Sequence, residues 1–112
     1  MTPGPMLLHE KDARGVVTLT LNRPQAFNAL SEGLLDALQS ALDRVAADDS
    51  ARVVVLAAAG RAFCAGHDLK EIRALGEQPK IAQLFASCSR MMATIPKLPQ
   101  PVIARVHGAA AA

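Results

Sequence analysis

A loop of small residues over 59–71 carries the groups of this 112-residue chain that are best suited to chemistry. It reads Ala-Gly-Arg-Ala-Phe-Cys-Ala-Gly-His-Asp-Leu-Lys-Glu and follows an apolar run at 52–57. Small residues let backbone N–H groups approach a ligand closely. Such an N–H can donate to a carbonyl oxygen, and it binds that oxygen more strongly as negative charge develops there. The spacing alone favours a plain strand-to-helix turn, because such loops are common in α/β folds.

Three side chains of this loop could take part in catalysis or metal binding. Cys64 and His67 could form a thiol–imidazole pair, and with Asp68 they could hold a metal ion. No second cluster of ligand residues accompanies them, so we predict no metal site. We instead expect Cys64 to be a small apolar side chain and Asp68 to cap a helix that begins at Leu69.

The composition excludes several classes of protein. Aromatic residues make up 3% of the chain and the net charge is +2, so neither a base-stacking surface nor a basic stripe for nucleic acid is present. No apolar run is long enough to span a membrane, and residues 1–5 show no secretory signal. Two cysteines are too few for a disulfide scaffold. We therefore expect a cytoplasmic protein with reduced thiols, no membrane contact and no nucleic-acid partner.

The elements that must position the loop follow from periodicity. An amphipathic helix is predicted after the N-cap Ser31, to about Ala47, and an apolar stripe predicts a second helix that Pro96 and Pro99 end. Gly76 to Pro79 should separate that second helix from the short one before it. The predicted strands lie at 7–10 and 16–21, which form a hairpin, and at 52–57 and 101–106, which are apolar enough to be buried on both faces. The expected helices cover 31–47, a short segment from 69, and 81–95.

The end of the sequence resembles an interrupted element. Ala109 to Ala112 follow a strand and a glycine, which is the pattern of a helix that is beginning. Four residues cannot form a stable helix alone, because nucleation is costly. We therefore expect the chain to be truncated, so that residues 1–112 form the N-terminal part of a single domain whose C-terminal half is absent.

Four co-linear segments resemble the crotonase superfamily, the enoyl-CoA hydratase/isomerase family. Residues 63–71, Phe-Cys-Ala-Gly-His-Asp-Leu-Lys-Glu, resemble its first fingerprint. Residues 21–30, Leu-Asn-Arg-Pro-Gln-Ala-Phe-Asn-Ala-Leu, resemble its entry segment, while 53–56 and 101–108 resemble its strands on either side. The resemblance covers the chain from about Val16 onward. It implies an α/β fold, a crotonase-like spiral of ββα units, here truncated after the second buried strand.

The family resemblance also implies a ligand and a mechanism. The ligand would be an acyl-CoA thioester, with coenzyme A as part of the substrate and no separate cofactor. Its carbonyl oxygen would lie in an oxyanion hole of two backbone N–H groups, one of them from Ala65. The other expected contacts with the ligand are Ala26, Gly66, His67, Asp68 and Leu69, the last near the adenine. Arg23, Arg61 and Lys70 could meet its phosphates, but we expect them to be solvated surface charges.

The second N–H donor and the acidic residues of hydratases and isomerases would fall beyond Ala112. The resemblance therefore implies a lyase or isomerase that stabilises an enolate in acyl-CoA or fatty-acid metabolism, while the chain alone is expected to be inactive. The alternative is a non-catalytic acyl-CoA binder or an inactive fragment. The complete protein would be a homotrimer or hexamer. The stripe 81–95 is expected to be core packing, although Met91 or Met92 could touch a fatty chain.

Overall fold

A β-hairpin opens the part of the chain that the computed structural model describes, residues 5–111. Strand β1 (Leu7–Lys11) pairs antiparallel with β2 (Val16–Leu21), as the sequence predicted. The turn between them is held by Asp12, whose Oδ1 accepts hydrogen bonds from the backbone N–H groups of Arg14 at 2.9 Å and Val16 at 3.1 Å. Alternate residues of β2 are buried, so one face of the hairpin is committed to a core.

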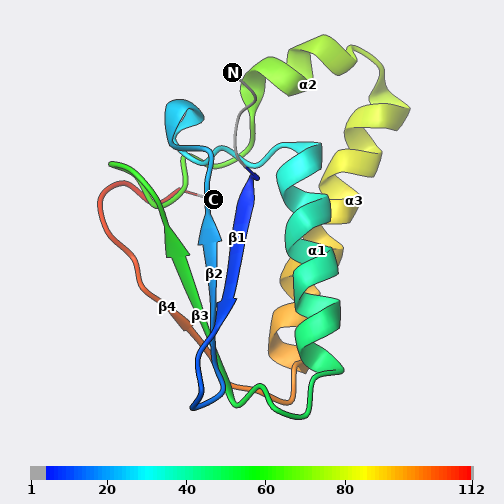
Figure 1. The fold of residues 1–112 in the computed structure, drawn as a ribbon. Helices are drawn as coiled ribbons and strands as arrows, with labels where there is room; N and C mark the ends of the chain where they lie inside the picture. Colours follow the sequence, from blue (N-terminus) through cyan, green and yellow to red (C-terminus); the bar gives the residue numbers. More distant parts are fainter. Residues whose placement is uncertain (1–4, 112) are drawn as a thin grey trace.

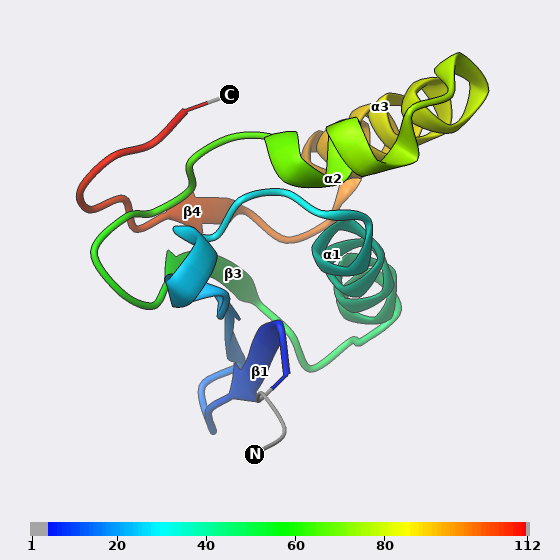
Figure 2. The same ribbon diagram turned by 90° about the horizontal axis from the view of Figure 1, so that it is seen from above.

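Two parallel strands extend the hairpin into a four-stranded sheet of order β1-β2-β3-β4. Strand β3 (Val53–Ala58) lies parallel to β2, and β4 (Val102–Ala104) lies parallel to β3. Parallel neighbours need crossover connections, which are supplied here by helices. Figures 1 and 2 show that α1 (Glu32–Ala46) and α3 (Gln78–Thr94) lie along the same face of the sheet. The core is therefore one layer between helices and sheet.

Helix α1 supplies most of that core. It begins after Ser31, whose Oγ accepts a hydrogen bond from the Leu34 N–H at 3.2 Å, as the predicted N-cap requires. Its inward stripe packs against buried side chains of β2 and β3, among them Leu19 and Val54. The buried residues of the stripe are Leu34, Leu35, Leu38, Ala41, Leu42 and Val45. The predicted helix over 31–47 is confirmed to within one residue at each end.

The prediction that two strands are buried on both faces was wrong. On the face of β3 that the helices cover, Val54 is fully buried while Leu56 and Ala58 are only partly buried, and on the opposite face only Ala57 is buried. Strand β4 is shorter than predicted and forms an edge of this sheet. Its Ile103 side chain is 56% exposed. These two strands are thus more apolar than their burial within residues 5–111 requires.

The two later helices differ from prediction at their boundaries. Asp68 caps α2 (Leu69–Leu75) as predicted, and Gly76 ends it in the left-handed conformation. Pro79, however, stands in the first turn of α3, where a missing N–H costs nothing, so it starts the helix rather than breaking it. Along the predicted stripe, Leu84 and Met91 are buried. Met92 is 57% exposed, so core packing is confirmed for only part of the stripe.

The predicted C-terminal helix is absent from the described residues. The backbone there is extended, and Ala110 forms a parallel bridge with Cys64. The Phe63 N–H donates to the Ala109 oxygen at 2.9 Å, and the Ala111 N–H donates to the Cys64 oxygen at 2.9 Å. In this extended conformation, residues 109–111 form backbone hydrogen bonds with Phe63 and Cys64. A helix of four residues would have almost no internal hydrogen bonds. Ala112 lies outside the described residues.

Candidate functional site

Two loops that are distant in sequence lie side by side and form the candidate site. The first follows the short 3-10 helix η1 (Pro24–Ala26), and the second is the loop before α2. The Leu30 N–H donates to the Gly66 oxygen at 2.7 Å, and the Asp68 N–H donates to the Leu30 oxygen at 3.0 Å. These bonds join the two segments that the sequence analysis singled out. Residues 109–111 lie along the second loop, at Phe63 and Cys64, as Figures 1 and 2 show.

The structure brings most of the predicted ligand contacts together. Ala65, Gly66, His67 and Asp68 are consecutive in the second loop, and Ala26 lies in the facing one, directly before Phe27. The Ala65 N–H donates to the Phe27 oxygen at 3.0 Å, which fixes this approach. Leu69 differs from the others. It is the first residue of α2 and its side chain is 71% exposed, so it reaches a ligand only if the ligand extends along the helix.

The backbone N–H of Ala65, which the family resemblance implied as an oxyanion donor, is already engaged. Because Ala65 donates to Phe27, its N–H is unavailable to a thioester unless that bond breaks. The His67 N–H is different: within residues 5–111 it has no hydrogen-bond acceptor. In the parallel bridge between Leu30 and His67, Leu30 bonds to the Gly66 oxygen and the Asp68 N–H. The N–H of His67 itself therefore points away from Leu30. Of these two backbone N–H groups, the one of His67 is therefore free to bind a ligand, and the one of Ala65 is not.

Gly66 makes this arrangement possible. Its φ of 91° lies in the left-handed region, which side chains with a Cβ rarely adopt. The Gly66 N–H donates to the Cys64 Sγ at 3.4 Å. Cys64 is thus a buried, reduced thiol that supports the turn. No group of three or more His, Cys, Asp and Glu side chains able to hold a metal occurs in the described chain.

The His67 side chain points toward α3. Its ring stands edge-on to the Phe85 ring, with centroids 4.6 Å apart and an interplanar angle of 67°. The buried Nδ1 has no hydrogen-bond partner in the described structure, so the thiol–imidazole pair with Cys64 is not formed. His67 therefore divides its roles: the ring anchors the loop to α3, and the backbone N–H is left free.

Asp68 and Arg23 form an ion pair beneath the two loops, which corrects the prediction of Arg23 as a solvated surface charge. The Arg23 Nη2 lies 3.2 Å from the Asp68 Oδ2, and the two side chains are 16% and 15% exposed. Arg23 Nη1 also donates to the Ala29 oxygen at 2.7 Å. Asp68 Oδ1 accepts from the Glu71 N–H at 3.1 Å. That backbone bond and then Arg23 hold the pKa of Asp68 below its usual value.

Sequence reasoning missed the role of Asn28. Its side chain is fully buried and its φ is 55°, a conformation that asparagine tolerates better than most residues. Its Oδ1 accepts from the Arg23 N–H at 2.7 Å. Its Nδ2 donates to the oxygens of Ala59 at 2.9 Å and Ala62 at 3.0 Å. The asparagine in the quoted Asn-Ala-Leu segment was the available signal, but sequence alone did not show what it joins.

Gly60 offers a test of how closely the two loops must approach. Its φ is 87°, and a Cβ built there would lie 2.7 Å from the Cβ of Pro24. We expect Gly60→Ala to lower the free energy of unfolding by about 2 kcal/mol, from backbone strain and this clash. Urea denaturation followed by circular dichroism measures the change. Gly33→Ala is the control, since Gly33 lies inside α1, where alanine favours the helix and meets only the flexible Met6 side chain; equal losses for both variants would contradict the close approach.

A mixed α/β chain with an antiparallel hairpin, parallel extensions and a backbone donor in the loop after β3 defines the class of the protein, a crotonase-like fold. A family model described as enoyl-CoA hydratase/isomerase matches residues 16–110. The chain belongs to this family. In the residues that the structure describes, no helix is both long and apolar enough to cross a membrane.

Individual relatives agree with the family match. An enoyl-CoA hydratase of known structure from Mycobacterium smegmatis is 62% identical, with a TM-score of 0.91 over 94% of this chain and 41% of its own. The human protein named enoyl-CoA hydratase domain-containing protein 3, mitochondrial, is 39% identical over 88% of this chain and 32% of its own length. The Escherichia coli 1,2-epoxyphenylacetyl-CoA isomerase is 38% identical over 88% of this chain and 38% of its own. The chain thus spans about two fifths or less of these relatives.

Proposed function

We propose that this chain binds an acyl-CoA thioester at the loop before α2 and donates the His67 backbone N–H to the thioester oxygen. The observation that carries the proposal is the unpaired His67 N–H in a loop otherwise held by hydrogen bonds on both sides. A thioester enolate is a high-energy anion, and a preorganised N–H donor of this kind stabilises the transition state by about 3 kcal/mol. The names of the relatives, which include an isomerase of a CoA thioester, support this ligand class.

We propose that catalysis, whether hydration or double-bond migration, belongs to a longer protein that contains this chain. Acid–base chemistry needs a carboxyl group that is free to exchange a proton with the substrate. The two carboxylates of the loop and α2 have structural partners: Asp68 pairs with Arg23, and Glu71 Oε1 accepts from the Glu32 N–H at 2.7 Å. That commitment favours the second candidate function for the chain alone, an acyl-CoA binder without catalysis.

Titration calorimetry with butyryl-CoA tests the proposed donor. We expect His67→Pro to weaken binding roughly 100-fold, because proline lacks the N–H while Gly66 before it tolerates the restricted backbone. His67→Ala is the matched control: it keeps the N–H, removes the ring, and should weaken binding by much less. Ala65→Pro tests the donor that the sequence first indicated, and it should act through the lost bond to Phe27, which circular dichroism would detect.

The two donors give distinguishable results. If a folded Ala65→Pro variant loses binding while His67→Pro keeps it, the donor is Ala65 and the assignment to His67 is wrong. If the folded wild-type chain does not bind butyryl-CoA, the proposed binding function of this chain fails. We further propose that no cofactor is required beyond the CoA of the substrate, that the longer protein is a homotrimer or hexamer, and that it is cytoplasmic. The human relative named as mitochondrial provides the alternative location to test by imaging.

A further inference from the structure

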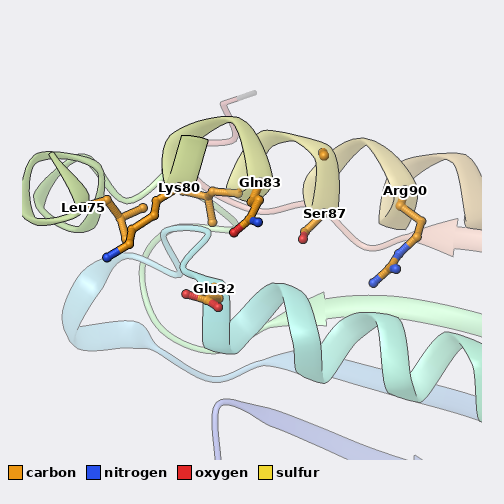
Figure 3. A pocket seen from close by; sticks show the side chains of 8 residues that line it. Glu32, Leu75, Lys80, Gln83, Ser87 and Arg90 are labelled. Atoms are coloured by element: carbon orange, nitrogen blue, oxygen red, sulfur yellow. The ribbon is translucent and has the colours of Figure 1, made fainter. Parts of the chain in front are cut away.

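A pocket separate from the loop site lies between the N-terminal half of α1 and one flank of α3. Its volume is about 630 Å³, a size typical of small-molecule sites. Figure 3 shows Gln83, Ser87 and Arg90 projecting from α3 toward α1, with Glu32 at the start of α1 pointing back. None of the residues expected to contact acyl-CoA lines it. Phe85, which contacts His67, is also not among the lining residues, so the pocket and the loop site are distinct.

The two ends of the pocket differ in charge. Glu32 and Lys80 line one end and carry opposite charges, so that end is neutral overall. Arg90 lines the other end, and no carboxylate within residues 5–111 lies within ion-pair distance of it. The Ser87 hydroxyl, about one helical turn from Arg90, has no hydrogen-bond partner among the described residues either, whereas Gln83 lies about 10 Å from Arg90 along the helix axis, beside Lys80 (Figure 3). Arg90 and Ser87 are therefore a pair of groups suited to a carboxylate, which a guanidinium binds in bidentate geometry.

Two leucines give the pocket an apolar part. Leu84 lies between the two ends and is 4% exposed, and the half-buried Leu75 lies at the end formed by Glu32 and Lys80 (Figure 3). Leu84 lies about 9 Å from Arg90 along the helix axis, from a rise of about 1.5 Å per residue. An occupant held by its carboxylate at Arg90 would thus lay an apolar chain of medium length over Leu84, with its end directed toward Leu75. A doubly charged or fully polar molecule would leave that wall uncompensated.

We propose that this pocket binds an unesterified monocarboxylate with a medium-length apolar chain, a ligand that lacks the CoA moiety of the loop site. Octanoate is the probe. In a titration of the isotope-labelled chain followed by NMR, octanoate should shift the amide signals of Leu84, Ser87 and Arg90 saturably. Arg90→Gln should weaken the affinity roughly tenfold or more, by removing the charge-assisted bonds. Octanol, which has the chain without the charge, should bind more weakly by a similar factor.

The controls separate this site from the loop and from general charge effects. Arg52→Gln removes an exposed arginine at the start of β3 and should leave octanoate affinity unchanged. Arg90 is itself exposed, so its substitution should not unfold the chain. His67→Pro should not change octanoate binding, and Arg90→Gln should not change butyryl-CoA binding, so either proposal can fail alone. Octanoate that does not bind, binds equally well to Arg90→Gln, or shifts only the loop signals overturns the pocket proposal, as does a dimer in sedimentation that Arg90→Gln abolishes.

Discussion

Asn28→Ala is expected to lower the free energy of unfolding by about 3 kcal/mol or more, a large part of the 5–15 kcal/mol that stabilises a typical domain. The buried amide satisfies three backbone groups, the N–H of Arg23 and the oxygens of Ala59 and Ala62. Removing the amide leaves these three groups without their partner, at roughly 1–3 kcal/mol each before relaxation, and the Ala62 oxygen is buried. Alanine also tolerates the φ of 55° less well than asparagine. Urea denaturation followed by circular dichroism measures the loss.

A second asparagine provides the comparison. Asn22 donates one side-chain hydrogen bond, to the Pro5 oxygen at 2.9 Å near the surface, so Asn22→Ala should cost about 1 kcal/mol. Asn28→Asp should destabilise at least as much as Asn28→Ala, because a carboxylate oxygen would face the two carbonyls that Nδ2 now serves. If Asn28→Ala costs no more than Asn22→Ala, Asn28 does not hold the two loops together.

The fold was predictable where local rules and tertiary structure agree. The β-branched and apolar composition of Val16–Leu21 and the Ser31 cap are local signals, and both elements form where expected. The burial of β3 and β4 was not predictable in the same way. An apolar composition permits burial on both faces of a strand, but it does not show which faces are covered within this chain. Pro79 was ambiguous for a different reason, because proline ends one helix and begins another with the same local geometry.

The sequence predicted which loop forms the candidate site, but not which of its backbone groups are free to bind a ligand. The resemblance located the loop, and the structure joins it to the segment after Ala26 through Phe27 and Leu30. Which N–H is free depends on the peptide orientations on either side of Gly66, and residue types do not encode these directly. The roles of Arg23 and Asn28 likewise depend on partners more than 30 positions away, Asp68 for the first and Ala59 and Ala62 for the second.

Arg23→Ala is expected to destabilise the chain by about 2–3 kcal/mol. Its partner Asp68 is 15% exposed, so the abandoned carboxylate would be only partly rehydrated, and the Ala29 oxygen would lose its donor. The matched control is Arg14→Ala. That arginine also pairs with an aspartate, Asp12, at 2.9 Å, but its side chain is 81% exposed, so its removal should not move the urea midpoint measurably. Similar losses in the two variants would mean that the Arg23–Asp68 pair is energetically a surface pair.

The same pair predicts how stability depends on pH. The folded-state pKa of Asp68 is lowered, so its ionised form stabilises the fold above the unfolded pKa near 3.8, and this contribution disappears as the pH falls through the folded value. Asp12 and Asp48 also have lowered pKa values, that of Asp48 about 2, so the wild-type profile alone cannot isolate Asp68. The difference between wild type and Asp68→Asn does so, because asparagine still caps α2 but cannot ionise. We expect that difference to be constant from neutral pH to about pH 5 and to shrink below pH 4. A difference that stays constant to pH 2 would show that the charge of Asp68 contributes nothing to stability.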